Sequence, residues 1–97
     1  MDVTSVAHAL SSETRVRLLA LLHEKKLTSS EAFELYNENY DSPKRRESVY
    51  RELENLVDAG LVEKKYQSSS KKLMYAVKAD TVCFDLGSGD VDITVGD

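Results

Sequence analysis

The hydrophobic periodicity of the chain changes at Gly60, and this change constrains the fold more than any other feature. Before Gly60, apolar residues recur every three or four positions, which is the spacing of amphipathic helices. After Gly60, apolar and polar residues alternate, as they do along half-buried strands. A chain of 97 residues is long enough for one domain. The sequence therefore predicts an α+β fold in which about four helices come first and strands follow.

The first two predicted helices are short and apolar. The first runs from Val3 to Leu10. The second begins after Ser11 or Ser12, either of which is a suitable N-cap. This second helix is apolar almost all round, so we expect it at the centre of the fold. Its apolar residues are Val16, Leu18, Leu19, Leu21 and Leu22.

Two further helices are predicted before Gly60. Thr28 and Glu31 have the spacing of a capping box and open a third helix, which carries the apolar residues Ala32, Phe33, Leu35 and Tyr36. A polar, turn-like segment follows from Asn37 to Asp41. Ser42 is a good cap and Pro43 suits a first helical position, so a fourth helix is predicted over about 43–59. Its inward stripe consists of Val49, Leu53, Leu56 and Val57.

Two β-hairpins are predicted after Gly60. Residues 61–67 and 72–78 form the first around a serine turn, and Leu73, Tyr75 and Val77 give its second strand one buried face. In the tail, Val82, Phe84 and Leu86 alternate before a turn at 87–90, and Val91, Ile93 and Val95 alternate after it. A lone hairpin is marginally stable, so this one must pack on the domain or on a second subunit, and we favour the second subunit. We accordingly divide the chain into a domain, 1–79, and an extension, 80–97.

The charge distribution separates these two parts. The chain carries a net charge of −4, yet residues 44–72 hold eight basic and five acidic residues, a net charge of +3. Residues 80–97 hold five aspartates and no basic residue. Phosphate binding depends on the local field and not on the charge of the whole chain. The basic region therefore favours nucleic acid, and the acidic extension does not.

Helix, turn, helix and a basic hairpin, in this order, are typical of a winged helix-turn-helix domain. The phrase LSSETRVRLL at 10–19 resembles the opening helix of ArsR-type winged-helix repressors. The segments SVYREL at 48–53 and DAGLV at 58–62 resemble the recognition helix and first wing strand of ArsR, PadR and TrmB-like regulators. A looser resemblance links residues 33–62 to the winged-helix domain of archaeal replication initiators. The connection before the fourth helix looks longer than the usual tight turn, and the chain lacks the Cys pair of metal-sensing ArsR proteins.

A DNA interface follows from this arrangement. A helix fits the major groove, and the lysines of a wing reach the flanking phosphates. The resemblance implies that Ser48, Tyr50 and Arg51 read bases, although Tyr50 is equally consistent with packing. The basic residues of the fourth helix start and of the wing (61–78) are assigned to phosphates: Lys44, Arg45, Arg46, Lys64, Lys65, Lys71 and Lys72.

Other readings of the sequence are weaker. His8 and His23 are isolated, which does not suit a zinc site, and Cys83 is predicted to be buried or half-buried in a strand. The aspartates around Gly87 and Gly89 suit a hairpin turn better than a Ca²⁺ loop. We see no catalytic constellation, membrane span or signal peptide, and we predict no enzyme, cofactor, metal or small-molecule ligand.

The function predicted from the sequence is transcriptional regulation through sequence-specific binding to double-stranded DNA, by a homodimer in the cytoplasm. The single cysteine fits a reducing compartment. The alternative is a protein-interaction module, or a replication-associated DNA-binding domain, that docks a partner through its acidic hairpin.

Overall fold

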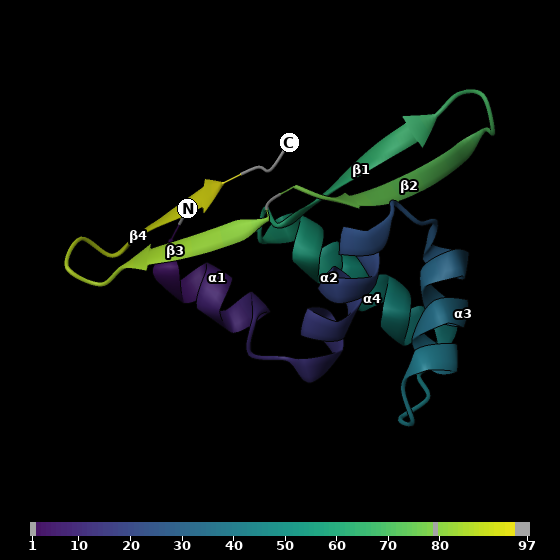
Figure 1. The fold of residues 1–97 in the computed structure, drawn as a ribbon, viewed down its shortest axis with the longest axis horizontal. Coiled ribbons are helices and arrows are strands. Elements are labelled where there is room, and N and C mark those ends of the chain that lie inside the picture. The colour runs from purple at the N-terminus through teal and green to yellow at the C-terminus, as the bar shows by residue number, and fades with distance from the viewer. Residues whose placement is uncertain (1, 79, 95–97) are drawn as a thin grey trace.

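The computed structural model describes residues 2–78 and 80–94, which form four helices followed by two β-hairpins (Figure 1). The helices are α1 (Val3–Ala9), α2 (Glu13–Glu24), α3 (Ser29–Asn39) and α4 (Arg46–Asp58). The strands are β1 (Val62–Gln67), β2 (Lys72–Val77), β3 (Thr81–Asp85) and β4 (Asp90–Thr94). β1 pairs antiparallel with β2, and β3 pairs antiparallel with β4. The predicted α+β order is confirmed.

Helix α2 lies at the centre of the fold, as predicted, and contacts α3, α4 and β2. Of its two predicted caps, Ser12 is the one used, and its side chain accepts a hydrogen bond from the amide of Arg15. The apolar sequence of α2 suggested that the helix is covered on every side, but Val16 is 46% exposed, so one side is open. The core draws on every helix, on both strands of the first hairpin and on β4: Val6, Ala9, Leu18, Leu22, Leu27, Ala32, Tyr36, Val49, Leu53, Leu56, Leu61, Val62, Tyr75 and Val91.

Helix α3 begins at the predicted capping box. The Thr28 hydroxyl accepts from the amide of Glu31, and the Glu31 carboxylate accepts from the amide of Thr28. The helix runs to Asn39, so the prediction of a turn from Asn37 onwards is wrong. The amide of Tyr40 donates to the carbonyl of Tyr36 at 3.0 Å, so the helical turn continues through Asn39, whose side chain donates to the carbonyl of Leu35 at 2.7 Å.

Helix α4 begins at Arg46, so the prediction that it begins at Ser42 and Pro43 is wrong. The amide of Lys44 donates to Oδ1 of Asn37 at 2.9 Å, and Nδ2 of Asn37 donates to the carbonyl of Lys44 at 3.1 Å. This pair of bonds holds the segment before α4 against α3, and the helix start moves three residues along the chain. The connection between α3 and α4 therefore spans residues 40–45, the long connection that the sequence indicated.

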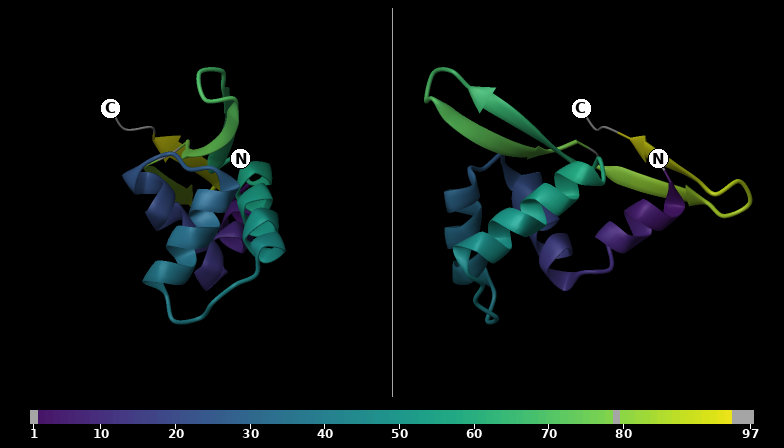
Figure 2. Two further views of the ribbon diagram at one scale, coloured as in Figure 1. Left: turned by 90° about the vertical axis from the view of Figure 1, so that its right-hand side faces the viewer. Right: turned by 180° about the vertical axis from the view of Figure 1, so that it is seen from behind.

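The hairpin β1–β2, hereafter the wing, projects from the helices on the side opposite to the hairpin β3–β4 (Figures 1 and 2). Leu27 bonds to the edge of β2 through both backbone groups of Tyr75, at 3.0 and 2.7 Å. Tyr75 is buried and Val77 partly buried, as predicted. Leu73 was predicted to share their buried face but is 44% exposed, because the outer part of the wing extends beyond the helices.

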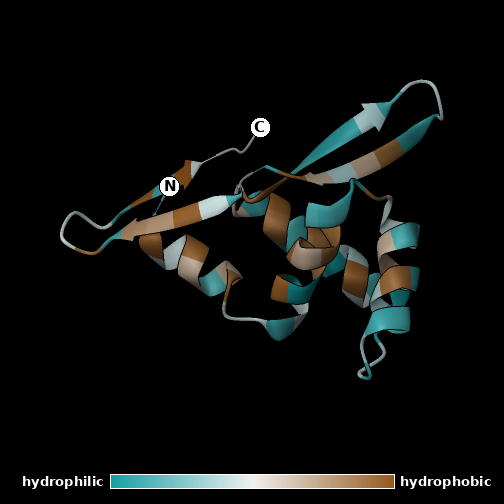
Figure 3. Cartoon of the chain, viewed as in Figure 1, coloured by the Kyte–Doolittle hydropathy of each residue, from teal (hydrophilic) through white to brown (hydrophobic). Residues whose placement is uncertain are grey.

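The hairpin β3–β4 packs on α1 of its own chain through its apolar face (Figure 3). Val91 is buried, and Val82 and Ile93, which pair across the two strands, are partly buried against the core. The turn spans residues 86–89 and not 87–90, because the Asp85 carboxylate accepts from the amides of residues 87 and 88. Leu86 is therefore a turn residue, 85% exposed, and not the strand residue predicted. Val95 lies outside the described residues.

Candidate nucleic-acid interface

Helix α4 turns one face to the core and the opposite face to solvent. Val49, Leu53 and Leu56 form its inward stripe as predicted, and all three are fully buried. At about 100° per residue, Glu47 and Arg51 lie opposite this stripe, and both are exposed. Seen from behind, α4 crosses the near side of the molecule, with α3 beside its first turns and the wing above it (Figure 2). Its outer face is therefore open to a partner.

Ser48 and Tyr50 lie on opposite flanks of α4. Two residues along a helix correspond to a rotation of about 200°, so the two side chains diverge. Ser48 shares its flank with Glu52, whose carboxylate is bound by Arg15 of α2 at 3.1 Å. Tyr50, 49% exposed, shares the other flank with Glu54, which contacts the wing. Of the three predicted base-reading residues, Tyr50 lies on the flank of α4 that faces the wing, Arg51 lies on the outer face, and Ser48 lies on the other flank.

The basic cluster before α4 is divided between a loop and the helix. Lys44 and Arg45 belong to the connection and not to the first helical turn predicted for them, whereas Arg46 is the first residue of α4. The guanidinium of Arg46 donates to the Ser30 hydroxyl at 2.7 Å and lies 4.7 Å above the centre of the Phe33 ring.

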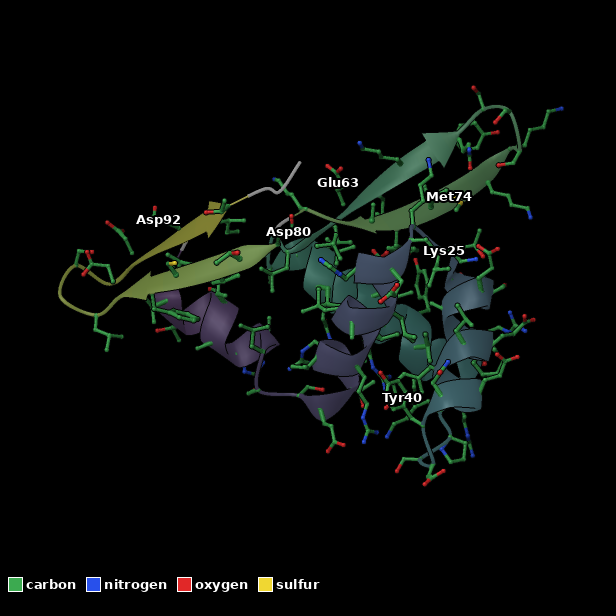
Figure 4. All side chains as sticks on the ribbon, viewed as in Figure 1. Lys25, Tyr40, Glu63, Met74, Asp80 and Asp92 are labelled. Carbon is green, nitrogen blue, oxygen red and sulfur yellow. The ribbon has the colours of Figure 1, made fainter. Side chains whose placement is uncertain are left out.

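Tyr40 lies at the end of α3 farthest from the wing (Figure 4). Arg17 covers its ring at 4.6 Å.

Glu54 joins α4 to the wing. Its carboxylate accepts from the Tyr75 hydroxyl at 2.6 Å and pairs with the Lys64 ammonium at 3.0 Å. The hydrogen bond from Tyr75, aided by Lys64, holds the pKa of Glu54 below its ordinary value. Burial and the neighbouring carboxylate raise the pKa of Tyr75. Because Tyr75 is almost completely buried, this contact fixes the angle between the wing and α4.

The predicted wing lysines do not form one set. Lys64 and Lys65 are neighbours in β1, so their side chains point to opposite faces of the wing. Lys65 pairs with Glu63 at 3.1 Å on the face turned away from α4. Lys71, in the turn, and Lys72, at the start of β2, are both exposed, and neither forms an ion pair within residues 2–78 and 80–94. The tip therefore carries the cations available to a ligand.

The acidic residues of α4 are partly neutralised within the fold. The helix holds four acids and two arginines, an unfavourable balance for a polyanion. Glu52 and Glu54 are paired with Arg15 and Lys64, however, and only Glu47 and Asp58 remain. In the part of the chain that the structure describes, Lys44, Arg45, Arg51, Lys71 and Lys72 have no acidic partner.

Three features of this surface were missed from the sequence. The sequence indicates Arg15 only as part of the segment at 10–19 that resembles ArsR-type repressors, yet the side chain is buried and binds α1 and α4. The contact of Glu54 with the wing was not predicted, and no local pattern indicates it. Tyr66 and Leu73 are exposed near the wing tip. The sequence allows this pair to be found: if the two predicted strands are aligned antiparallel around the serine turn, Tyr66 falls opposite Leu73.

The remaining candidate groups form no site. No cluster of three or more His, Cys, Asp or Glu side chains that could hold a metal ion occurs among the described residues. His23 instead approaches Asp80 at 3.3 Å. Cys83 is exposed on the outer face of β3, so the prediction that it is buried or half-buried is wrong. None of the described helices is long and apolar enough to cross a membrane.

Two solved structures resemble this fold. An ArsR-like transcriptional regulator from Rhodococcus sp. RHA1 matches with a TM-score of 0.62 and 27% identity, over 77% of this chain and 63% of that one. The ferric uptake regulator from Pseudomonas aeruginosa, determined with manganese, matches with a TM-score of 0.62 and 16% identity, over 96% of this chain and 74% of that one.

The present chain spans less than two thirds of the ArsR-like regulator. No family model and no curated protein matches the sequence. The predicted fold and the predicted resemblance are confirmed: the chain has a winged helix-turn-helix fold with an additional C-terminal hairpin and is similar to an ArsR-like transcriptional regulator.

Proposed function

We propose that the protein is a transcriptional regulator that binds double-stranded DNA in a sequence-specific manner, with α4 in the major groove. The observation that carries this proposal is a set of cations in a fold similar to that of a transcriptional regulator. Among the described residues, these cations have no acidic partner, and they lie in the connection before α4, on the outer face of α4 and at the wing tip. A helix fits the ~12 Å major groove, and unpaired lysines and arginines release counterions from phosphates.

The geometry narrows the predicted contacts. We assign Tyr50 and Arg51 to base edges, because Arg51 lies on the outer face of α4 and Tyr50 on the flank that faces the wing. The loop and the wing tip then reach the phosphates on either side. Ser48 and Lys65 are left out of this set, because each points to the side away from the wing–α4 angle. The proposed phosphate contacts are Lys44, Arg45, Arg46, Lys64, Lys71 and Lys72.

The double substitution Lys71→Ala/Lys72→Ala is expected to reduce the salt dependence of binding. Each phosphate contact contributes about 0.9 to the slope of log affinity against log salt, so the slope should fall by up to about 2. A salt titration with a fluorescent duplex measures it. The control is Lys26→Ala/Lys78→Ala, which removes the same charge from exposed positions outside the proposed contacts. Equal slopes for the two variants would remove the wing from the interface.

Arg51→Ala is expected to relax sequence preference more than it weakens general binding. A bidentate arginine–guanine contact is worth about 1–3 kcal/mol of discrimination, or roughly 5- to 150-fold. Selection from a random duplex library, followed by competition with an unrelated duplex, measures both quantities. Glu47→Ala is the matched control on the same exposed face of α4. A uniform loss of affinity on all sequences would instead make Arg51 a phosphate contact.

We further propose that the protein acts as a homodimer in the cytoplasm. Regulators of this fold read two half-sites one helical turn apart, which requires two copies. Val16, Phe84 and Leu86 are exposed apolar side chains outside α3, α4 and the wing, and they are available to a second copy. A single exposed thiol, Cys83, suits a reducing compartment.

A protein-docking module is the second candidate function. Among the described residues, Glu47 and Asp58 of α4 form no ion pair. Exposed apolar side chains lie on α4 (Tyr50) and on the wing (Tyr66 and Leu73). Docking on an apolar patch is weakly dependent on salt, whereas DNA binding weakens steeply. The salt titration with generic duplex therefore separates the two functions.

A further inference from the structure

An exposed apolar pair occupies the outer part of the wing, whereas Val62, Met74 and Tyr75 of the same strands are buried. Tyr66 of β1 lies directly opposite Leu73 of β2 in the antiparallel register. Tyr66 is 64% exposed and Leu73 is 44% exposed. The residues that follow at the tip, 67–72, are glutamine, serine and lysine only. The apolar pair therefore lies inside a polar and basic rim.

The orientation of the pair follows from the alternation of the strands. Tyr66 and Leu73 are each two residues from the pair Lys64–Tyr75, so all four side chains point to the same face of the wing. Lys64 and Tyr75 contact Glu54, which shows that this face is turned toward α4. The apolar pair lies about 6–7 Å farther out along the strands, beyond that contact.

The pair does not pack on the body of the domain. Leu73 and Lys72 line one side of an open groove of about 430 Å³. The other side of this groove is the polar start of α3, with Ser29, Ser30 and Glu31. Since α3 offers no apolar cover here, Leu73 is available to a ligand that lies along this groove, and Tyr66, directly opposite it, is 64% exposed.

We infer that Tyr66 and Leu73 form an apolar wedge that enters the minor groove beside the major-groove site of α4. This inference rests on the proposed DNA binding. Lys71 and Lys72 follow the pair at the tip, where both are exposed and form no ion pair among the described residues, and this positive charge suits DNA and not an apolar protein partner. Apolar side chains in the minor groove partly unstack a base step and bend the duplex.

The wedge has a consequence for sequence preference. Pyrimidine–purine steps, TA and CA/TG, are the easiest to unstack, whereas A-tracts are stiff. The protein should therefore prefer a flexible step where the wing lies, although no side chain there forms a hydrogen bond to a base. The expected preference is about 5- to 150-fold, the range of a single unfavourable base pair.

The test compares Tyr66→Ser/Leu73→Ser with the wild type and with Tyr66→Phe/Leu73→Ile, in the full chain. Duplexes selected by the wild type from a random library are labelled at both ends, and energy transfer reports bending. The serine variant should lose the bend and the step preference, to about 1- to 2-fold, and keep the salt slope, because it removes no charge. The Phe/Ile variant should keep the bend. Circular dichroism should show an unchanged fold, since both side chains are exposed.

Three outcomes would overturn the inference. If the serine variant bends DNA and selects steps as the wild type does, the wedge is absent while the proposed function stands. If the wild type binds no duplex, the proposed DNA binding and the wedge fail together. If the serine substitutions change the sedimentation of the protein without DNA, the pair is a contact between copies of the chain. Loss of bend and preference in the serine variant alone supports the wedge.

Discussion

Arg15→Ala is expected to lower the free energy of unfolding by about 2–4 kcal/mol, the largest effect of a single polar substitution in this fold. The side chain is buried, with 9% of the residue exposed. Its guanidinium donates to the carbonyl of Ala9 at 2.6 Å and to that of His8 at 2.9 Å, which satisfies the end of α1. It also binds Glu52 of α4 at 3.1 Å. Removing it leaves the carbonyl of Ala9 without this donor and Glu52 without its cation, although the carbonyl of His8 still accepts from Ser11 and the Glu52 carboxylate from Asn55.

Thermal and urea denaturation measure this loss. For a domain of this size, each kcal/mol shifts the melting temperature by about 4–8 °C, so a fall of about 8–32 °C is expected. Arg51→Ala removes the same side chain from an exposed position and should change stability by no more than about 0.5 kcal/mol. Arg15→Lys should recover only a minor part, because one ammonium does not reproduce the planar fork. Similar losses for Arg15→Ala and Arg51→Ala would contradict the structural role.

The helices were predictable from the sequence where local and long-range preferences agree. Val49, Leu53 and Leu56 recur at helical spacing and are all fully buried. Gly60 has a φ of 81°, a left-handed conformation that glycine adopts without strain, and it ends α4 as predicted. The Thr28–Glu31 capping box is a local motif, and it forms. In each case the signal lies within a few residues of the element that it defines.

The prediction failed where a distant side chain overrides the local signal. Ser42 and Pro43 are a good helix start by propensity, but Asn37 binds the backbone of Lys44 and keeps it outside the helix. That bond depends on how α3 and the connection lie in space. The turn at Leu86 is a different, local case: the Asp85 carboxylate accepts from the amides of Gly87 and Ser88, a turn motif that hydrophobic alternation does not report.

The candidate site was predictable in composition but not in geometry. The alternation of strand side chains separates Lys64 from Lys65, and this was open to inference from the sequence. The pairing of Lys64 with Glu54 was not, because it needs the angle between α4 and the wing. The same holds for Arg15 and Glu52, which are 37 residues apart in the chain. A count of charged residues therefore overstates how many basic and how many acidic side chains remain outside ion pairs.

Val91→Asp is expected to detach the hairpin β3–β4 from α1. Val91 is 7% exposed and belongs to the core, and β4 contacts α1. Losing a buried valine costs about 1.5–3 kcal/mol, and burying a carboxylate there adds an unfavourable desolvation. A loss of about 2–4 kcal/mol is therefore expected, with faster hydrogen exchange of the α1 and β4 amides. Thr94→Asp places the same charge on the exposed face of the same strand and should leave stability unchanged.

The same substitution separates two roles for the hairpin. Asp85, Asp90 and Asp92 lie on its outer face, and Asp92 points away from α1 (Figure 4), so we expect this face to repel phosphate and to take no part in DNA binding. If the hairpin carries the contact with a second copy, Val91→Asp yields a monomer in sedimentation that binds a two-half-site duplex poorly. Leu86→Ser should then also weaken the dimer without loss of stability, because Leu86 is 85% exposed. A dimer that survives both changes would restrict the hairpin to covering α1 of its own chain.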